Sequence, residues 1–533
     1  MAVFASLLPV LALPSWVAVG IAVLLVYKFV IYPSFLSPLA RIPAARWHAR
    51  FLPFYSLYLK YTGTESRTTL KLHQRYGPVV RLGPNELTVN CYEGGIKTIY
   101  GGGFPKTDWY QNGFANYETE NVFTVKGKEH GQIKRVFSHT LANSTILSSS
   151  SIRARAWRAI FDQLCPILRQ SCKSRTPIDI HPLNYAYAMD TYTSFQLGDE
   201  LATDFLTDAD TREWYLNHSK TLLATQNFFW ATEVPNLTNW LFKLGFQPIP
   251  FDAIESKLAL EDFFIKKYDR AAQVLNGEET HSQDTSKRPT LFALAHARFG
   301  NIYKDSESPG RQPYPHRLQI ASNLYDQSLA ATENNGIALT YVHYELARRP
   351  EVQSALRTEL LAAEPDLITA DNTFGDPKAI ESLRLLDAIV TETLRIHPPA
   401  GAALPRTTPG PGTSTIGGFE GIPPGVRVEA RAWALHRNPD VFPEPEEWRP
   451  ERWLGATPGQ LTEMKRWFWA FGSGPRMCTG NHFAMLSIKL AIAAIYLHFS
   501  TSVVDAEGVD MEQEDAVVSR PKGDKLMLQF HEI

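Results

Sequence analysis

The sequence predicts a mainly α-helical protein with a small β portion. Apolar residues recur at helical spacing through most of residues 126–344, while only short stretches alternate as strands do. Residues 317–349 lie between Pro315 and Pro350 and have the pattern of one long helix. At 1.5 Å per residue that helix would be roughly 50 Å long, so we expect it to cross the core.

The N-terminus predicts a membrane anchor. The first 27 residues carry no charged side chain, and a run of about 20 apolar residues spans a bilayer as a helix. A cleaved signal peptide fits less well, because the run is long and no basic segment precedes it. We therefore predict a transmembrane signal anchor over residues 1–31, with the span near 13–31. The positive-inside rule then leaves the rest of the chain cytoplasmic, since basic residues follow the run: Lys28, Arg41, Arg46 and Arg50.

The chain after the predicted anchor is interpreted as a hinge followed by one large domain. Residues 32–50 include the Pro-rich stretch "YPSFLSPLARIP", which is typical of a semi-rigid hinge. Residues 51–533 are predicted to form a single domain. Its two polar stretches, 276–289 and 303–316, are interpreted as surface loops, because the helical pattern resumes after each.

Two stretches account for the β portion, and a helix follows near the C-terminus. "GPVVRLGPNELTVN" predicts a two-stranded element, and "TIGGFEGIPPGVRVEARAWALH" predicts a hairpin with a Pro-Gly turn. A last helix is expected over residues 481–498, after a Gly-rich loop.

Composition excludes several functions. The formal net charge is −2 and no basic tract is present, so the sequence gives no reason to expect nucleic-acid binding. The four cysteines, in a chain of 533 residues, do not resemble a disulfide framework. No two are spaced as CxxC, so a zinc site is also unsupported.

One cysteine stands in a specific motif. "WAFGSGPRMCTGNHFAM" has the order FxxGxRxCxG, which should recur by chance only on the order of once in several thousand such sequences. The alternative is a free cysteine beside a helix N-terminus. A thiolate that binds haem iron needs stabilisation, and backbone N–H groups leading into a helix provide it. The motif residues are Phe471, Gly474, Arg476, Cys478 and Gly480.

These residues resemble the cysteine loop of the cytochrome P450 family, the haem-thiolate monooxygenases, and specifically its fungal microsomal members. The resemblance implies the cytochrome P450 fold and a b-type haem whose iron takes the Cys478 thiolate as axial ligand. It also implies that Arg476 binds a haem propionate, while the two glycines let the backbone approach. Further implications are NADPH-derived electrons from NADPH-cytochrome P450 reductase, a hydrophobic small-molecule substrate, an endoplasmic reticulum membrane location, and a monomer.

The resemblance also assigns a structural network. The family's ExxR pattern occurs five times, but only Glu392 is followed by "TLRIHPPA", as in the family. Glu392 and Arg395 would form an i,i+3 pair, joined by Arg452 of "WRPERW" to hold the cysteine loop. Arg406 of "LPRTT" resembles a propionate-binding arginine of the family.

A helix upstream resembles a second propionate-binding motif. In "GKEHGQIKRVFS", His130 stands where the family's WxxxR motif has Trp, and Lys134 where it has Arg. Both side chains can donate to a propionate. The alternative, a His–Lys pair on a surface helix, remains open.

The long central helix resembles the family helix that carries an AGxDT-type stretch beside bound dioxygen. "LAATENNGIALTY" places Ala331 for the glycine, Glu333 for the acid and Asn334 for the threonine. Glu333 and Asn334 are therefore the predicted catalytic residues. The run Asn-Asn-Gly is expected to weaken the helix and make room for O₂ and water. The alternative is a polar turn that faces solvent.

Asn334 leaves the type of reaction open. The threonine hydroxyl of the family can pass a proton on as it receives one, whereas the Asn amide donates and accepts hydrogen bonds without behaving as a ready acid. A water held by Glu333 and Asn334 could replace the relay, a substrate hydroxyl could serve, or the chemistry could tolerate poor proton delivery. The main hypothesis is a monooxygenase of fungal secondary metabolism. The competing hypotheses are desaturation, oxidative coupling or isomerisation on the same scaffold, and a non-catalytic haem-binding membrane protein.

Substrate contacts are assigned only to segments. The aromatic-rich residues 107–123 resemble the family's variable substrate-covering loop, and residues 227–230 and 400–404 also resemble substrate-contacting segments. A largely apolar pocket is the expectation.

Overall fold

The computed structural model describes residues 15–277, 290–302, 314–368 and 374–533. The chain divides into two compact units. Unit 1 holds the residues up to 105 and residues 404–430, and unit 2 holds residues 106–403 and 431–533. Most of the two polar stretches predicted as loops lies outside the described residues.

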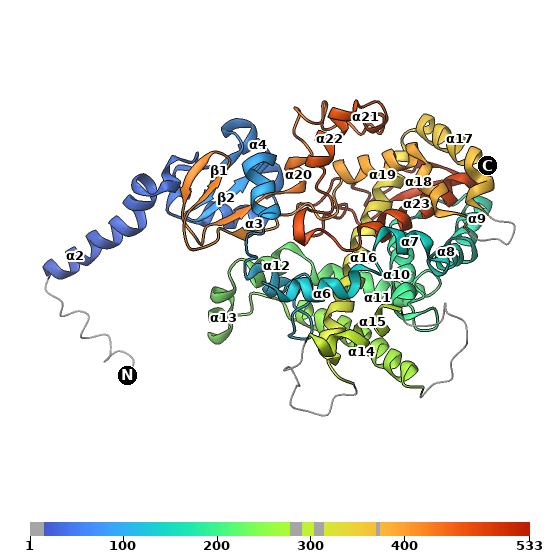
Figure 1. Cartoon of the computed structure of the whole chain (residues 1–533), viewed down its shortest axis with the longest axis horizontal. Coiled ribbons are helices and arrows are strands. Elements are labelled where there is room, and N and C mark those ends of the chain that lie inside the picture. The colour runs from blue at the N-terminus through green and yellow to red at the C-terminus, as the bar shows by residue number, and fades with distance from the viewer. Residues whose placement is uncertain (1–14, 278–289, 303–313, 369–373) are drawn as a thin grey trace. The chain divides into compact units, whose positions relative to one another are not determined.

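Unit 1 contains short helices and a four-stranded sheet (Figure 1). The sheet order is β1-β2-β7-β4, in which β1–β2 and β7–β4 are antiparallel and β2–β7 is parallel. The predicted two-stranded element is confirmed as β1 and β2. The elements are α2 (Ser15–Val26), η2 (Tyr27–Leu36), η3 (Pro38–Arg41), η4 (Trp47–Arg50), α3 (Phe54–Thr62), α4 (Glu65–Tyr76), β1 (Val79–Gly83), β2 (Glu86–Val89), η5 (Tyr92–Gly101), β4 (Arg406–Thr407) and β7 (Arg427–Glu429).

The N-terminal apolar segment is helical where it is described. Trp16–Leu36 is the one described helix that is long and apolar enough to cross a membrane, with 21 residues and a mean hydropathy of 2.0. Only 6% of its most apolar window is buried by the rest of the chain. Its length and composition therefore suit a membrane anchor.

The predicted hairpin near the end of the β portion is present, but the prediction of a Pro-Gly turn in it is wrong. β5 (Ser414–Ile416) and β6 (Phe419–Ile422) form an antiparallel hairpin around Gly417 and Gly418. Both glycines have positive φ, 54° and 87°, as tight hairpin turns require. The Pro424–Gly425 pair instead follows β6 and leads to β7, which belongs to the four-stranded sheet.

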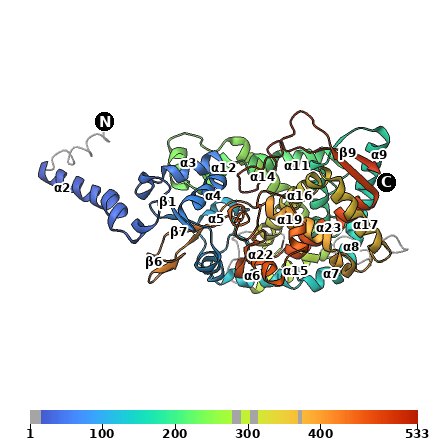
Figure 2. The ribbon, with the colours of Figure 1, turned by 90° about the horizontal axis from the view of Figure 1, so that it is seen from above.

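Unit 2 is predominantly helical, with one three-stranded sheet of order β3-β9-β8 (Figure 2). Both strand pairs are antiparallel, so the last strand of the chain lies between the other two. The strands are β3 (Ile178–Asp179), β8 (Phe499–Val503) and β9 (Met527–Glu532). The helices are α5 (Trp109–Phe114), α6 (Glu129–Ser138), α7 (Asn143–Ser148), α8 (Ser150–Trp157), η6 (Arg158–Leu164), α9 (Cys165–Ser174), α10 (His181–Leu197), α11 (Ala209–Leu222), α12 (Thr225–Thr232), α13 (Pro235–Lys243), α14 (Phe251–Leu275), α15 (Thr290–Arg298), η8 (Phe299–Asn301), α16 (Arg317–Ala347), α17 (Pro350–Leu367), α18 (Pro377–Ser382), α19 (Arg384–Ile396), α20 (Ala432–Leu435), α21 (Glu451–Leu454), α22 (Pro458–Trp467), η9 (Gly474–Arg476) and α23 (Asn481–His498).

Two helices cross the core of unit 2 together. α16 has 31 residues and contacts α10 more extensively than any other pair of elements does among the described residues. Nearly every residue of α10 is buried. The prediction of a long helix over 317–349 is confirmed to within two residues, and the last helix has its predicted bounds.

The expected weakening of α16 at Asn-Asn-Gly is wrong. The helix is α-helical without interruption from Arg317 to Ala347. Gly336 lies against the ring of Tyr185 on α10, and a Cβ at this position would overlap that ring. The glycine therefore serves the close packing of two helices, a role that the local sequence does not reveal.

Candidate functional site

Cys478 lies in the turn between η9 and α23. The Cys478 backbone N–H donates to the Phe471 carbonyl at 2.9 Å, which closes the loop. Gly474 has a φ of 68°, in the left-handed region that favours glycine. A Cβ at Gly480 would lie 4.0 Å from the Cys478 Sγ, which is an ordinary contact. Backbone conformation thus accounts for the glycine at 474, while sterics beside the sulfur do not require the one at 480.

The surroundings of Cys478 act on its thiol in opposite directions. Desolvation is the largest influence and raises the pKa of the thiol above its usual value, while the backbone N–H of Gly480, the Lys134 ammonium and the backbone N–H of Asn481 oppose the rise. The N–H groups belong to the start of α23, which is the arrangement that stabilises a thiolate at a helix N-terminus. Cys478 is itself exposed, so its sulfur is accessible to a ligand.

α6 brings Lys134 to the cysteine loop. Its Nζ donates to the carbonyls of Pro475 at 2.9 Å and Met477 at 3.1 Å. Burial lowers the pKa of Lys134, Cys478 opposes this shift and Arg476 adds to it. His130, one turn earlier on α6, is buried with 8% exposure. The structure therefore places Lys134 next to Cys478, and the alternative of an isolated surface His–Lys pair does not describe this helix.

The two predicted propionate-binding arginines lie in different units. In unit 2, Arg476 donates from Nη1 to the carbonyl of Val125 at 2.8 Å, which ties the cysteine loop to the segment before α6. In unit 1, Arg406 is buried on β4 with its guanidinium 5.1 Å from the centroid of the Tyr100 ring.

Glu392, Arg395 and Arg452 form a buried network. Arg395 binds the Glu392 carboxylate with two nitrogens, each at 2.8 Å, and the Arg452 Nε lies 2.9 Å from Oε1. The side chains of Glu392 and Arg395 are 0% exposed. Burial would raise the pKa of Glu392, but hydrogen bonds and charge from the two arginines hold it below its usual value.

The same network fixes the chain that leads to the cysteine loop. Arg395 donates to the carbonyls of His436, Pro445 and Glu447. The indole of Trp453 donates to Glu392 Oε2 at 2.9 Å. Sequence reasoning identified the three charged residues but not Trp453, which stands beside Arg452 in "WRPERW" without a distinguishing signal.

Glu333 forms a buried ion pair that sequence reasoning missed. Arg520 donates from Nη2 and Nε to Glu333 Oε2, at 2.6 and 3.1 Å. Glu333 is 1% exposed and Arg520 6%. Arg520 also donates to the hydroxyl of Ser219 on α11 at 3.0 Å. The two partners are 187 residues apart and belong to no common motif, so only the folded chain brings them together.

Asn334 lies on a different side of α16 from Glu333. It is half-buried, and its Nδ2 donates to the Ala330 carbonyl at 2.8 Å on its own helix. Successive helical residues point about 100° apart, which separates the Asn334 amide from the Glu333–Arg520 pair. The accessible side of this part of the helix carries Ala330 and Asn334.

Two of the three predicted substrate-contacting segments meet in an aromatic cluster. Phe228 of α12 lies 5.4 Å from Trp109 and 5.2 Å from Phe114, measured between ring centroids. Phe114 in turn lies 4.9 Å from Phe123. Residues 107–123 and 227–230 therefore share one aromatic cluster in unit 2. Residues 400–404 divide between the two units.

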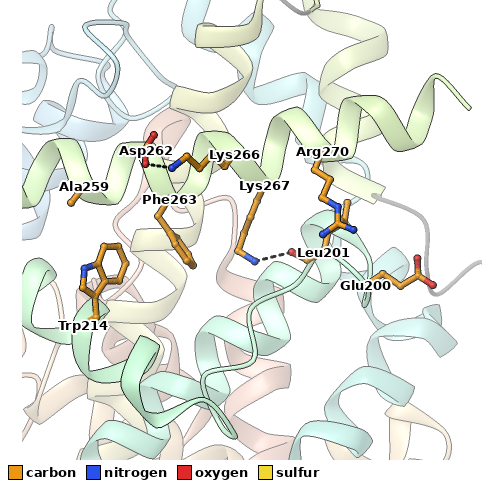
Figure 3. A pocket seen from close by; sticks show the side chains of 9 residues that line it. All are labelled: Glu200, Leu201, Trp214, Ala259, Asp262, Phe263, Lys266, Lys267 and Arg270. Atoms are coloured by element: carbon orange, nitrogen blue, oxygen red, sulfur yellow. Dashed lines mark hydrogen bonds and ion pairs between the residues drawn. The ribbon is translucent and has the colours of Figure 1, made fainter. Parts of the chain in front are cut away.

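A groove elsewhere in unit 2 contains none of the predicted site residues (Figure 3). It has a volume of about 480 Å³ between α11, α14 and the turn at residues 200–201. Lys266 pairs with Asp262 at 2.6 Å, and Lys267 donates to the carbonyls of Leu201 and Ala202. These contacts hold both ammonium groups against neighbouring groups of the protein.

The donor set around Cys478 fits a haem thiolate. The sulfur is accessible, two backbone N–H groups and Lys134 favour its ionised form, and the Glu392 network rigidifies the preceding chain. A mainly helical fold with this loop defines the class of haem-thiolate proteins.

Comparison with known proteins identifies the family within this class. The model of the family described as "Cytochrome P450" matches residues 49–528 of this chain. Similar proteins include cytochrome P450 monooxygenase orf2 of Aspergillus niger, which is 24% identical over 94% of this chain and 95% of its own length. Cytochrome P450 monooxygenase apf7 of Gibberella fujikuroi is 28% identical, over 92% and 91% of the two chains. BipB of Cochliobolus sativus, also named a cytochrome P450 monooxygenase, is 27% identical over 93% and 92%.

The chain therefore belongs to the cytochrome P450 family and is an enzyme of the monooxygenase class. Membership implies a haem whose iron is bound by a cysteine thiolate.

Proposed function

We propose that this enzyme inserts one atom of O₂ into a hydrophobic small molecule of fungal secondary metabolism. NADPH-cytochrome P450 reductase supplies the electrons, and the catalytic domain lies on the cytoplasmic side of the endoplasmic reticulum membrane, held by a single span near the N-terminus. The accessible Cys478 beside N–H donors carries the proposal. The fungal relatives and the apolar helix Trp16–Leu36 support its pathway and its location.

Each residue around the cofactor has a proposed role. Cys478 would hold the haem iron through its thiolate, and a bound haem would supply O₂ activation. Lys134, His130, Arg476 and Arg406 are the proposed donors to the propionates. Lys134 supports this role best, because its ammonium already lies beside the cysteine loop and donates to two carbonyls there.

Glu333 and Asn334 are proposed to handle protons through water. Arg520 donates to Glu333 Oε2, and the Tyr185 hydroxyl lies against the same carboxylate. A carboxylate can accept about four hydrogen bonds, so Glu333 keeps capacity to accept from a water as well. The Asn334 amide lies on the accessible side of α16, away from the Glu333–Arg520 pair, and would bind a water or substrate hydroxyl of its own there.

The fate of molecular oxygen tests the proposal. The full chain would be expressed with a fungal reductase in a host that makes candidate scaffolds, under isotopically heavy dioxygen. A product that gains one heavy oxygen atom supports monooxygenation. A product that lacks it, but depends on Cys478, supports desaturation, coupling or rearrangement, the second candidate that Asn334 favours. The variant Cys478→Ala should lose the thiolate spectrum of the reduced CO complex, and persistence of that spectrum contradicts the ligand assignment.

A further inference from the structure

α16 carries an acidic side chain that motif comparison does not single out. Asp326 is half-buried, while residues 320–325 immediately before it are all buried. It precedes Ala330 by four residues and Asn334 by eight, so the three lie along one side of the helix. Ala330 is exposed and Asn334 half-buried, which makes this the accessible side of the central helix.

The Asp326 carboxylate has unused hydrogen-bonding capacity. It accepts no hydrogen bond and forms no ion pair with any residue in the described parts of the chain. The next residue, Gln327, does have a protein partner, because its Oε1 accepts a hydrogen bond from the Tyr192 hydroxyl at 2.9 Å. An ionised carboxylate can accept about four hydrogen bonds, and the half-buried Asp326 receives none of them from the described residues. A ligand that donates to Asp326 would use this capacity.

The charged neighbour of Asp326 favours its ionised form but does not neutralise it by contact. Lys106 lies within electrostatic range of Asp326, yet its ammonium donates to the Phe123 carbonyl. It also lies 4.2 Å from the Tyr110 ring centroid and 4.4 Å from that of Phe123. Burial raises the pKa of Asp326 to about 7, and Lys106 opposes the rise. A large part of the carboxyl is therefore ionised at neutral pH.

The segment that supplies Lys106 also brings apolar surface to this part of α16. The Ser322 hydroxyl donates to the Thr119 carbonyl, and the backbone N–H of Val122 donates to Asn323 Oδ1, both at 2.9 Å. These bonds anchor residues 119–122 on the helix turn just before Asp326. The aromatic cluster of residues 107–123 thus lies near the Asp326 carboxylate, a combination that suits an amphiphile with one cationic end.

We propose that Asp326 determines substrate specificity by binding a protonated amine, with the apolar remainder of the substrate extending along α16 toward Asn334. This inference rests on the proposed function and adds a substrate class to it. At 1.5 Å per residue, Asp326 and Asn334 are separated by about 12 Å along the helix axis. The preferred substrate would therefore carry its basic nitrogen on the order of 12 Å from the carbon that reacts. The direct contact outweighs repulsion from Lys106, because charge interactions weaken with distance.

Binding of a matched ligand pair tests the proposal without turnover. The probes are N,N-dimethyloctylamine and its hydrocarbon isostere, in which CH replaces the nitrogen, and the protein is the full-length holoenzyme in detergent. Equilibrium dialysis gives dissociation constants for the wild type and for Asp326→Asn. Asp262→Asn is the matched control, because Asp262 is a solvent-exposed carboxylate on α14. The expected result is about tenfold tighter binding of the amine than of the isostere, lost in Asp326→Asn and kept in Asp262→Asn.

The pH dependence gives a second readout. Tyr192 of α10 and the adjacent Tyr325 also interact electrostatically with Asp326, but burial raises their pKa values so far that both stay neutral. Asp326 is then the group of this set that titrates near neutrality. Amine affinity should rise severalfold from pH 6 to pH 8 in the wild type and stay flat in Asp326→Asn. Equal amine affinity in wild type and Asp326→Asn, or no preference for the amine over the isostere, would overturn the proposal. Failure of the proposed function appears separately, as absence of heavy oxygen in products while this binding remains measurable.

Discussion

Arg520, thirteen residues before the C-terminal Ile533, holds Glu333 near the middle of the longest helix with two nitrogens on one carboxylate oxygen, at 2.6 and 3.1 Å. Both side chains are almost fully buried. Although desolvation disfavours a charged Arg520, the Glu333 carboxylate raises its pKa above the usual value. The pair therefore fixes the C-terminal segment to α16 through one oxygen of Glu333, Oε2.

Arg520→Met should destabilise the fold strongly. The substitution leaves the Glu333 charge buried without its partner, which costs about 3–5 kcal/mol. Thermal unfolding of the holoprotein measures the effect. Adding Glu333→Gln should recover part of the loss, because the buried charge is then removed. Arg466→Met removes a half-exposed ion pair with Glu463 and should change stability by less than about 1 kcal/mol. A similar loss in both single variants would contradict the role of burial.

Gly336→Ala should also destabilise the protein. The added methyl overlaps the Tyr185 ring, and overpacking of a tight core costs about 1–3 kcal/mol. Chemical denaturation with far-ultraviolet circular dichroism gives the difference. Gly459→Ala on α22 is the control, since a Cβ there meets no atom within 4 Å, and it should be neutral or stabilising. Replacing the ring with a smaller aliphatic side chain in the double variant Tyr185→Leu/Gly336→Ala should make the alanine less destabilising than it is beside Tyr185, and failure to do so would argue against the steric explanation.

Glu392 should contribute to stability in a pH-dependent manner. Its pKa in the folded protein is below the model-compound value of 4.5, so its contribution is present above pH 4.5 and is lost as pH falls through the folded pKa. Between pH 6 and pH 4.5 the wild type should be more stable than Glu392→Gln by about 3–5 kcal/mol, and the difference should shrink at lower pH. Urea unfolding at a series of pH values measures this, with Glu463→Gln as a surface control. A difference that grows on acidification would contradict the sign.

Lys134→Gln should weaken haem retention. Loss of the ammonium removes a positive charge that favours the Cys478 thiolate and a donor that holds two carbonyls of the cysteine loop. Haem content per protein after gel filtration should fall severalfold, while Lys134→Arg keeps most of it. Lys128→Gln, an exposed residue just before α6, should match the wild type. Unchanged haem content in Lys134→Gln would show that Lys134 does not support the cofactor.

Local patterns were enough to predict the elements and the motif, because helical periodicity, caps and turn residues act over a few positions. The bounds of α23, the length of α16 and the pairing of β1 with β2 follow from such patterns. The hairpin turn was misplaced because a Gly-Gly pair and a Pro-Gly pair compete within ten residues, and the positive φ values at Gly417 and Gly418 suit a tight hairpin.

The sequence by itself determined the family, the cysteine loop with Cys478, and the three charged residues of the Glu392 network, since each belongs to a short contiguous pattern. Only the tertiary structure decided that Arg520 pairs with Glu333, that Gly336 accommodates Tyr185, and that Asp326 has no protein partner among the described residues. Those relationships join segments more than a hundred residues apart or depend on what surrounds a side chain. Ion pairing, steric fit and desolvation are properties of the packed chain, and no local pattern encodes them.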